Sequence, residues 1–373
     1  MNTKKLKILL VMGSGSDPAD NNQLFKNNIY GSLQLLGHEV HLVHFDVFLA
    51  SINEPNESIR KTRLEEHILT EYRNKGPFDY FLGFLEDSLV SPSIFNELKN
   101  EVFTINWGCN SHQFETLHKK ISPFIDLNTY ISKGHKQLYD SVGAKSFWSP
   151  MAASDQIYKP RNVKDIDISF IGSAYGNRPY YIWRLLQSNI PLEIFGTGWK
   201  YENSLKNLLR LYIAPIIYNF YDRTRLLDNL DKIKRINLIK LISEYTEVGL
   251  NVSDEEYAEI LSRSKVSLNF PESRRNHDYL NPEVTFGCNF RDFEIPLSGA
   301  MLMTQDSEEL DYFYERETEV IAFGNENDMI EKARYYSSHS SAAEKIARKG
   351  HERAISDHTW QRRFDQLFQH LEN

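Results

Sequence analysis

Cysteine is scarce in this sequence. Its 373 residues include only Cys109 and Cys288, which form no CxxC pair and have no metal-site spacing. We therefore expect two thiols without a metal or redox role, and no disulfide framework.

Long apolar runs are also missing. No stretch reaches the roughly 18 apolar residues that a membrane-spanning helix needs. The basic start and its short apolar run resemble a signal peptide, but a Gly-Ser loop and Asp17 follow in place of a small-residue cleavage site. We read the run as a first buried strand and expect a cytoplasmic protein.

Basic residues do not predominate, because the net charge is -8. An acidic surface disfavours general nucleic-acid binding, which needs clustered Lys and Arg. A local basic pocket for a diphosphate is still compatible with this charge.

Several catalytic motifs are absent. The sequence has no HExxH and no G-x-S-x-G elbow. It also has no DxD pair suited to holding a metal on a diphosphate, since Asp165 and Asp167 flank the start of a predicted strand, the wrong end for a ligand. We expect no required metal and no cofactor.

What is present is an alternation of strand and helix signals in two successive cycles. Such alternation is typical of parallel sheets with right-handed crossovers. The predicted strands are 7–12, 39–45, 79–84, 102–107 and 127–131, then 165–171, 192–195, 266–270 and 300–304. The predicted helices are 22–36, 58–73, 91–99, 133–142, 179–187, 253–262, 290–297, 308–313, 327–337, 342–355 and 360–371.

Segment 149–160 breaks the alternation with two prolines and small residues, so we place a linker there. The prediction is an α/β protein with two Rossmann-like, doubly wound domains, 1–155 and 156–355. The helix in 356–373 is expected to pack back toward the first domain.

The segment 204–244 is strongly helical, and we favour an inserted helical pair packed on the second domain. The alternative is an interfacial helix touching a membrane with a lipid-linked acceptor, although Pro215 disfavours one long helix.

Each domain opens with a glycine-containing loop after its first strand, where doubly wound sheets bind ligands. In the first domain, Gly13, Ser14 and Gly15 offer free backbone N–H groups to a phosphate or sugar, or form an ordinary tight turn. In the second domain, Gly172 and Gly176 belong to the loop GSAYGNR, and Arg178 begins the next helix. Its charge adds to the positive helix end and suits a pyrophosphate leaving group. The alternative is that Arg178 is an ordinary surface residue.

The stretch RDFEIPLSGAMLMT, residues 291–304, resembles the R-x-F-E block of CgeB-type (spore maturation protein) glycosyltransferases. The segments DISFIGSAYGNR, SDEEYAEILSRSKVSLNF and the C-terminal tail are similar to the same family, and the first domain less closely. The resemblance implies the GT-B fold, with two domains facing across a cleft. It also implies a nucleotide-sugar held mainly by the second domain.

The resemblance also assigns residues. Glu294 matches the glutamate that usually contacts the donor ribose, and a carboxylate can accept from two hydroxyls. Arg291 matches the family arginine, a second candidate for the diphosphate, and Ser298 and Gly299 complete the block. Alternatively, Arg291 and Glu294 pair within the helix at i and i+3. The first glutamate of the E-x7-E arrangement is replaced by Phe286, which leaves the retaining assignment open.

The resemblance to GT-B enzymes implies that acceptor-side groups come from the first domain, where the candidates for a catalytic base are alternatively surface or capping residues, and a retaining mechanism needs no strong base. His112 follows a strand end and is our candidate, while Glu86 and Asp87 follow another strand. The function predicted is glycosyl transfer from a nucleotide-sugar to a glycan, lipid-linked glycan or protein. The alternatives are a GT-B protein that binds nucleotide or glycan without turnover, and a sugar-nucleotide epimerase.

Overall fold

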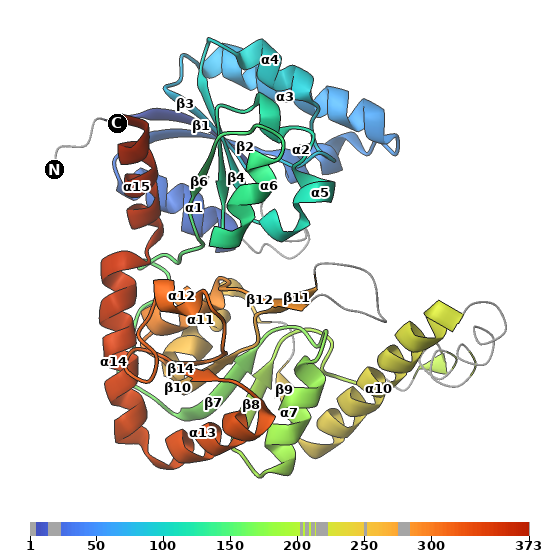
Figure 1. The fold of residues 1–373 in the computed structure, drawn as a ribbon, viewed down its shortest axis with the longest axis vertical. Helices are drawn as coiled ribbons and strands as arrows, with labels where there is room; N and C mark the ends of the chain where they lie inside the picture. The colour runs from blue at the N-terminus through green and yellow to red at the C-terminus, as the bar shows by residue number, and fades with distance from the viewer. Residues whose placement is uncertain are drawn as a thin grey trace. The chain divides into compact units, whose positions relative to one another are not determined.

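The computed structural model describes residues 5–13, 24–201, 204, 205, 209, 213, 223–249, 252–274 and 284–372. They form two compact units: residues 1–157 with 357–373, and residues 158–356. Each unit contains a six-stranded parallel sheet, and the α/β fold predicted from the sequence is confirmed (Figure 1).

In unit 1 the sheet order is β2-β1-β3-β4-β5-β6. The strands are β1 (Lys7–Met12), β2 (Glu39–His44), β3 (Tyr80–Gly83), β4 (Phe103–Gly108), β5 (Leu127–Tyr130) and β6 (Ser146–Trp148). The helices are α1 (Leu24–Leu35), α2 (Phe45–Ile52), α3 (Glu57–Lys75), α4 (Pro92–Leu98), α5 (Phe114–Leu117), α6 (Lys136–Asp140) and α15 (Trp360–Glu372). The order reverses between β1 and β3, so unit 1 has a topological switch point there.

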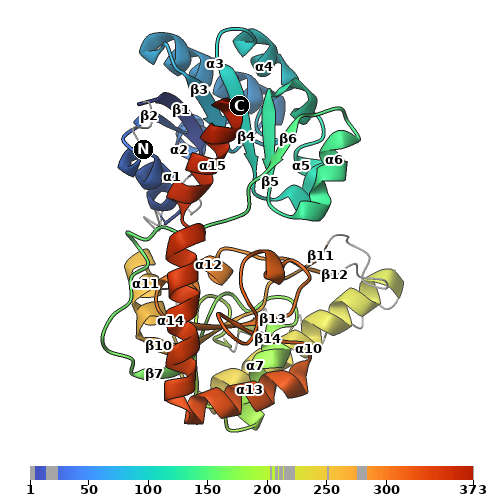
Figure 2. The same ribbon diagram turned by 60° about the vertical axis from the view of Figure 1, so that its left-hand side comes forward.

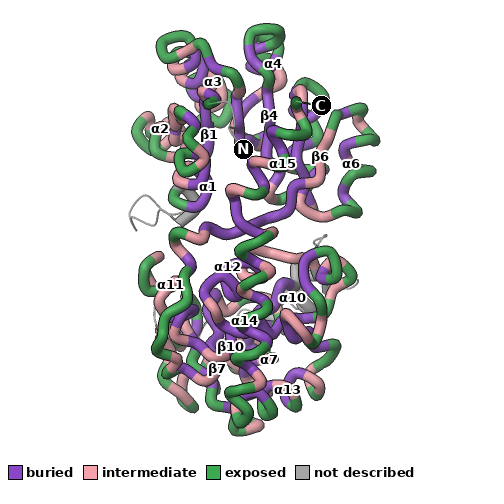
Figure 3. The backbone as a smooth tube through the Cα atoms, turned by 90° about the vertical axis from the view of Figure 1, so that its left-hand side faces the viewer, coloured by how far each residue is buried: buried purple, intermediate pink, exposed green. Residues whose placement is uncertain are grey.

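Helices cover both faces of this sheet, and its central strands are buried (Figure 3). On one face, α3 contributes Leu64, Ile68 and Tyr72 at helical spacing to the core. On the other face, α15 lies along α1 (Figure 2). Trp360 and Phe364 of α15 are fully buried and both pack edge-on against Trp107 of β4, so the end of the chain completes the core of unit 1.

In unit 2 the sheet order is β14-β13-β10-β7-β8-β9. The strands are β7 (Ile166–Ile171), β8 (Leu192–Phe195), β9 (Val248–Gly249), β10 (Ser264–Asn269), β13 (Met301–Gln305) and β14 (Ile321–Phe323), with a hairpin of β11 (Glu272–Arg274) and β12 (Val284–Phe286). The helices are α7 (Arg178–Gln187), α10 (Arg223–Tyr245), α11 (Asp254–Arg263), α12 (Arg291–Leu297), α13 (Glu326–Ser338) and α14 (Ser340–Asp357).

The inserted segment is described only in part. Its second half forms α10, whose Ile242 is fully buried in the core of unit 2 and whose Tyr245 packs edge-on against Trp183 of α7. This end of the segment therefore packs on the second domain, as one of the two interpretations predicts. No helix among the described residues is long and apolar enough to cross a membrane.

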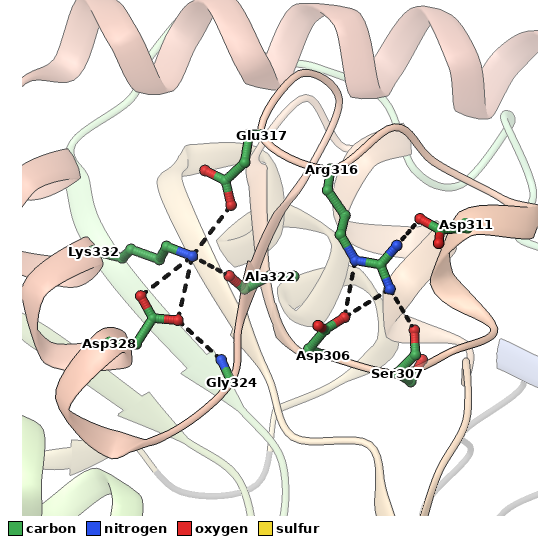
Figure 4. A network of polar contacts seen from close by, with 9 residues as sticks. All are labelled: Asp306, Ser307, Asp311, Arg316, Glu317, Ala322, Gly324, Asp328 and Lys332. Atoms are coloured by element: carbon green, nitrogen blue, oxygen red, sulfur yellow. Dashed lines mark hydrogen bonds and ion pairs between the residues drawn. The ribbon is translucent and has the colours of Figure 1, made fainter.

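The prediction was wrong in several short elements. Residues 45–52 form α2, which had not been predicted, and the strands β6, β9, β11, β12 and β14 were also missed. The predicted helix 308–313 is a single 3-10 turn, Leu310–Tyr312. The connection from β13 to β14 is held instead by polar contacts (Figure 4). Arg316 bonds Asp306 and the Ser307 carbonyl at 2.8 Å each, and Lys332 of α13 donates to the Glu317 carboxylate at 3.2 Å.

Candidate active site

The loop that follows β7 in unit 2 brings two predicted arginines together. A Cβ atom added at Gly172 would stand 3.3 Å from an Nη of Arg178 and 3.3 Å from an Nη of Arg291. The two guanidinium groups come from α7 and α12, more than a hundred positions apart in the chain. Two positive charges therefore meet at the carboxyl end of the first strand of the sheet, where open α/β sheets bind their ligands.

Arg178 is held by backbone carbonyls. It is buried, at 4% exposure, and its Nη atoms donate to the carbonyls of Phe270 (3.1 Å) and Ser173 (3.3 Å). The ring of Tyr175 covers the guanidinium, with 3.9 Å between the ring centroid and Cζ. These contacts fix the orientation of the charge at the first residue of α7, where the helix dipole adds to it.

A second loop supports the first. Gly196, after β8, has φ +121° and stands so close to Gly172 that a Cβ would lie 2.7 Å from the Gly172 carbonyl oxygen. Trp199 donates its indole N–H to the same oxygen at 2.6 Å. The loop after β8 therefore holds the Gly172 peptide in place, and it can come this close only because residue 196 is a glycine.

Helix α12 positions Arg291 through a buried network at its first turn. Asp292 accepts from Asn269 (2.8 Å), Thr304 (3.0 Å) and the Asn289 backbone N–H (2.8 Å). Burial raises the pKa of Asp292 to about 6. Arg291 itself is half-buried and donates Nε to the Ile171 carbonyl at 2.8 Å, which directs its Nη atoms toward Gly172.

Glu294 is buried on the same helix, at 3% exposure. One carboxylate oxygen accepts from the Tyr158 hydroxyl at 2.9 Å and the other from the Tyr257 hydroxyl at 2.5 Å. Burial raises the pKa of Glu294, against these hydrogen bonds and the nearby charge of Arg291. Within the described residues Glu294 and Arg291 form no ion pair, so the alternative of a simple i, i+3 pair is not what the structure shows.

Some predicted residues lie elsewhere. Ser298 and Gly299 are at the opposite end of α12 from Arg291, and Gly299 (φ +72°) packs against Pro160 as the residue after the helix cap. Ser14 and Gly15 lie outside the described residues. Phe286 belongs to β12. Asp165 and Asp167 are paired with Arg263 and Lys265.

Unit 1 contains a cavity of about 300 Å³ at the carboxyl ends of β1 to β4. Gly13 forms part of its wall, and a Cβ there would come within 2.9 Å of the Phe45 ring. The lining residues are Gly13, Phe45, Asp46, Phe84, Leu85, Glu86, Trp107, Cys109, Asn110 and His118. The predicted Glu86 is among them, whereas His112 and Asp87 are not.

His118 is one of the lining residues that sequence reasoning missed. It is 2% exposed, and neither ring nitrogen has a hydrogen-bond partner of normal geometry among the described residues. Burial lowers the pKa of His118 to about 4, so the ring is neutral near pH 7. Burial raises the pKa of Glu86, which the Asn110 side chain opposes by hydrogen bonding. Nothing local in the sequence distinguishes His118 from the other histidines.

Comparisons with known proteins bear on both units. A family model described as glycosyl transferase-like matches residues 182–369, half of the chain. No curated protein sequence is significantly similar to the chain.

Solved structures match over nearly the whole chain. Sucrose-phosphate synthase from Thermosynechococcus elongatus has a TM-score of 0.62 at 11% identity, covering 98% of this chain and 99% of the other. Anabaena HepE in complex with UDP and glucose has a TM-score of 0.61 at 9% identity, covering 99% and 100%. AviGT4, a glycosyltransferase involved in avilamycin A biosynthesis, has a TM-score of 0.59 at 13% identity, covering 98% and 96%. These likenesses confirm the GT-B fold.

Proposed function

Because the chain belongs to the glycosyl transferase-like family, we propose that it moves a sugar from a nucleotide-diphosphate sugar to an acceptor hydroxyl. The observation that carries the proposal is the meeting of Arg178 and Arg291 at Gly172. Bound diphosphate would satisfy both guanidinium groups. The remote likeness to a structure that holds UDP and glucose supports the same class of donor.

The chemistry explains why two arginines are useful. Transfer breaks the bond between the anomeric carbon and a phosphate oxygen and forms a bond to the acceptor oxygen, so the diphosphate leaves with an extra negative charge. Charged donors already oriented toward that oxygen stabilise the transition state more than the ground state. Arg178 and Arg291 are oriented by backbone carbonyls before any ligand arrives, so little reorganisation is needed.

We assign Glu294 to the donor ribose. Tyr158 and Tyr257 hold its two oxygens and fix the carboxylate plane, and each oxygen retains a lone pair for a ribose hydroxyl. This role requires the buried carboxylate to become accessible when the nucleotide binds. We also propose that the chain belongs to the CgeB-type branch, works in the cytoplasm and needs no metal.

The test is nucleotide affinity and turnover. UDP, GDP and TDP are titrated by calorimetry into the wild type and the variants Arg178→Gln and Arg291→Gln. Each loss of a charged hydrogen bond is expected to weaken the preferred nucleotide by about 10- to 100-fold. Arg263→Gln is the matched control, because Arg263 pairs with Asp165 at the start of β7. Unchanged affinity in both variants would remove these arginines from the site.

Turnover separates the proposal from its alternatives. Labelled nucleotide-sugars should be hydrolysed or consumed in transfer, with nucleoside diphosphate released. Nucleotide binding without release of sugar would identify a binding protein, and interconversion of the sugar without transfer would identify an epimerase.

A further inference from the structure

The cavity of unit 1 lies at the switch point of its sheet. Gly13 follows β1 and Phe84 to Glu86 follow β3, the two strands between which the order reverses. Crevices at this place are the usual ligand sites of open α/β sheets. The volume of about 300 Å³ is at the small end of ligand pockets, room for one ring rather than a chain of sugars.

The wall combines apolar rings with hydrogen-bonding groups. Phe84 and Trp107 are stacked, with 6.1 Å between their ring centroids, and Phe45 adds a third ring. The polar groups are the carboxylates of Asp46 and Glu86 and the amide of Asn110, together with His118. Aromatic surface beside carboxylate and amide groups suits a molecule with apolar C–H faces and hydroxyls at its edge.

His118 gives independent evidence of a ligand. It is almost completely buried and lines the cavity, and the Leu85 backbone is its one hydrogen-bonding group among the described residues, which leaves a ring nitrogen for a ligand. A buried ring nitrogen without a partner destabilises the empty protein. A hydroxyl-bearing ligand, as donor and acceptor, can satisfy a neutral imidazole at either nitrogen.

The charge of the cavity favours uncharged acceptors over phosphorylated ones. Two of the described lining residues are acidic and none is Lys or Arg. A phosphate brought here would meet like charge without a counter-ion, which disfavours phosphorylated sugars and lipid diphosphates.

We propose that this cavity binds the acceptor as a single uncharged sugar ring, with the Glu86 carboxylate accepting a hydrogen bond from an acceptor hydroxyl. Asn110 orients that carboxylate, and His118 contacts the ring. The inference rests on the proposed function, because it names the acceptor of the same reaction.

The experiment uses the full chain with its preferred nucleotide-sugar. The methyl glycosides of glucose, galactose, mannose and N-acetylglucosamine are compared with the corresponding 6-phosphates and with a polyprenyl diphosphate-linked sugar. At least one neutral glycoside should accelerate release of nucleoside diphosphate and show saturation-transfer NMR signals. In the Glu86→Gln variant the KM for that neutral glycoside should rise about tenfold or more, and the nucleotide affinity should be unchanged.

Two further variants guard against misfolding and non-specific effects. Asn110→Leu, at an exposed position, should raise the same KM. Glu97→Gln, which loses only a surface pair with Arg73, should behave as wild type. Use of phosphorylated acceptors alone, an unaltered KM in Glu86→Gln, or no binding of any neutral glycoside would overturn the proposal. Normal nucleotide affinity in those cases would leave the proposed function standing, whereas loss of nucleotide binding by the wild type would remove that function itself.

Discussion

Some buried side chains in this protein have pKa values far from those usual for their residue type. His118 is buried in neutral form, with its pKa lowered to about 4 from the usual 6.5 by desolvation, against the charge of Asp87 and a hydrogen bond with the Leu85 backbone, and with a small contribution from His112. In the unfolded chain the same ring takes up a proton near its usual pKa. Between these two values the unfolded state binds more protons, so the free energy of unfolding falls as the pH falls.

We therefore predict that His118→Leu reduces the acid sensitivity of unit 1. Urea unfolding of wild type and variant at pH 7 and pH 4.5 should show up to about 3 kcal/mol less dependence on pH in the variant. At pH 7 the stability of the variant should be close to that of wild type, because the apolar side chain avoids the desolvation of the imidazole but loses its hydrogen bond with the Leu85 backbone.

The wild type must be compared with the His118→Leu variant, because titration of Asp292 changes the free energy of unfolding with pH in the opposite direction. Its pKa is raised to about 6, so its contribution to stability increases as the pH falls through that value. Asp292 is present in both proteins and cancels in the difference. Identical pH profiles would show that His118 is not buried as a neutral ring.

The site could be predicted from the sequence only in part, and the reason lies at this scale. Arg178 was predicted from its place after a strand and a glycine loop, and Arg291 from a family resemblance. Nothing in the chain between them indicates that they meet at Gly172, because that contact depends on tertiary packing. His118 and the two tyrosines on Glu294 are found only when burial is known.

Among the helices and strands, α11 has the clearest local sequence signal for where it begins. Ser253 accepts from the Glu256 backbone N–H, and the Glu256 carboxylate accepts from the Ser253 backbone N–H at 2.7 Å, the capping box that the spacing predicts. Asn325 likewise caps α13 through the backbone N–H groups of Asn327 and Asp328.

Ser253→Ala is expected to lower the free energy of unfolding of unit 2 by about 1 kcal/mol, because the Glu256 backbone N–H loses its acceptor. Thermal and urea unfolding measure the loss. Ser338→Ala, at the C-terminal end of α13, serves as the control and should change stability by less than about 0.5 kcal/mol. Equal effects of the two substitutions would contradict a capping role.

Long periodic elements were predicted well and short ones poorly. Helix α3 buries an evenly spaced apolar stripe, and β1 is a continuous apolar run, so each has a pattern of its own. Helix α2 begins at Phe45 directly after β2, and its apolar residues read as a continuation of that strand. The hairpin β11–β12 has three residues a strand, too few for a period.

At the scale of the molecule, the two units differ in how the chain builds them. Unit 2 is one continuous segment, 158–356, whereas unit 1 needs both 1–157 and 357–373. Trp360 and Phe364 lie fully buried in unit 1, and the bridge from Ala153 to Thr359 joins its two segments.

We predict that residues 158–356 fold alone and bind the preferred nucleoside diphosphate with the affinity of the full chain, since Gly172, Arg178, Arg291 and Glu294 all belong to this segment. Residues 1–157 alone should not fold stably, because losing two buried aromatic side chains costs about 3–5 kcal/mol each, comparable to the whole stability of a domain. Circular dichroism and calorimetry of the two fragments test both statements. A folded 158–356 that binds no nucleotide would contradict the location of the site.

The discontinuous first unit has a consequence for synthesis. On the ribosome, residues 1–157 of unit 1 are translated before unit 2, yet the core of unit 1 stays open until α15 leaves the exit tunnel. The later domain can therefore mature before the earlier one, the reverse of the usual vectorial order. A nonsense codon or a proteolytic cut just before Trp360 would leave a protein with an intact second half and a first half that chaperones and proteases recognise as unfinished.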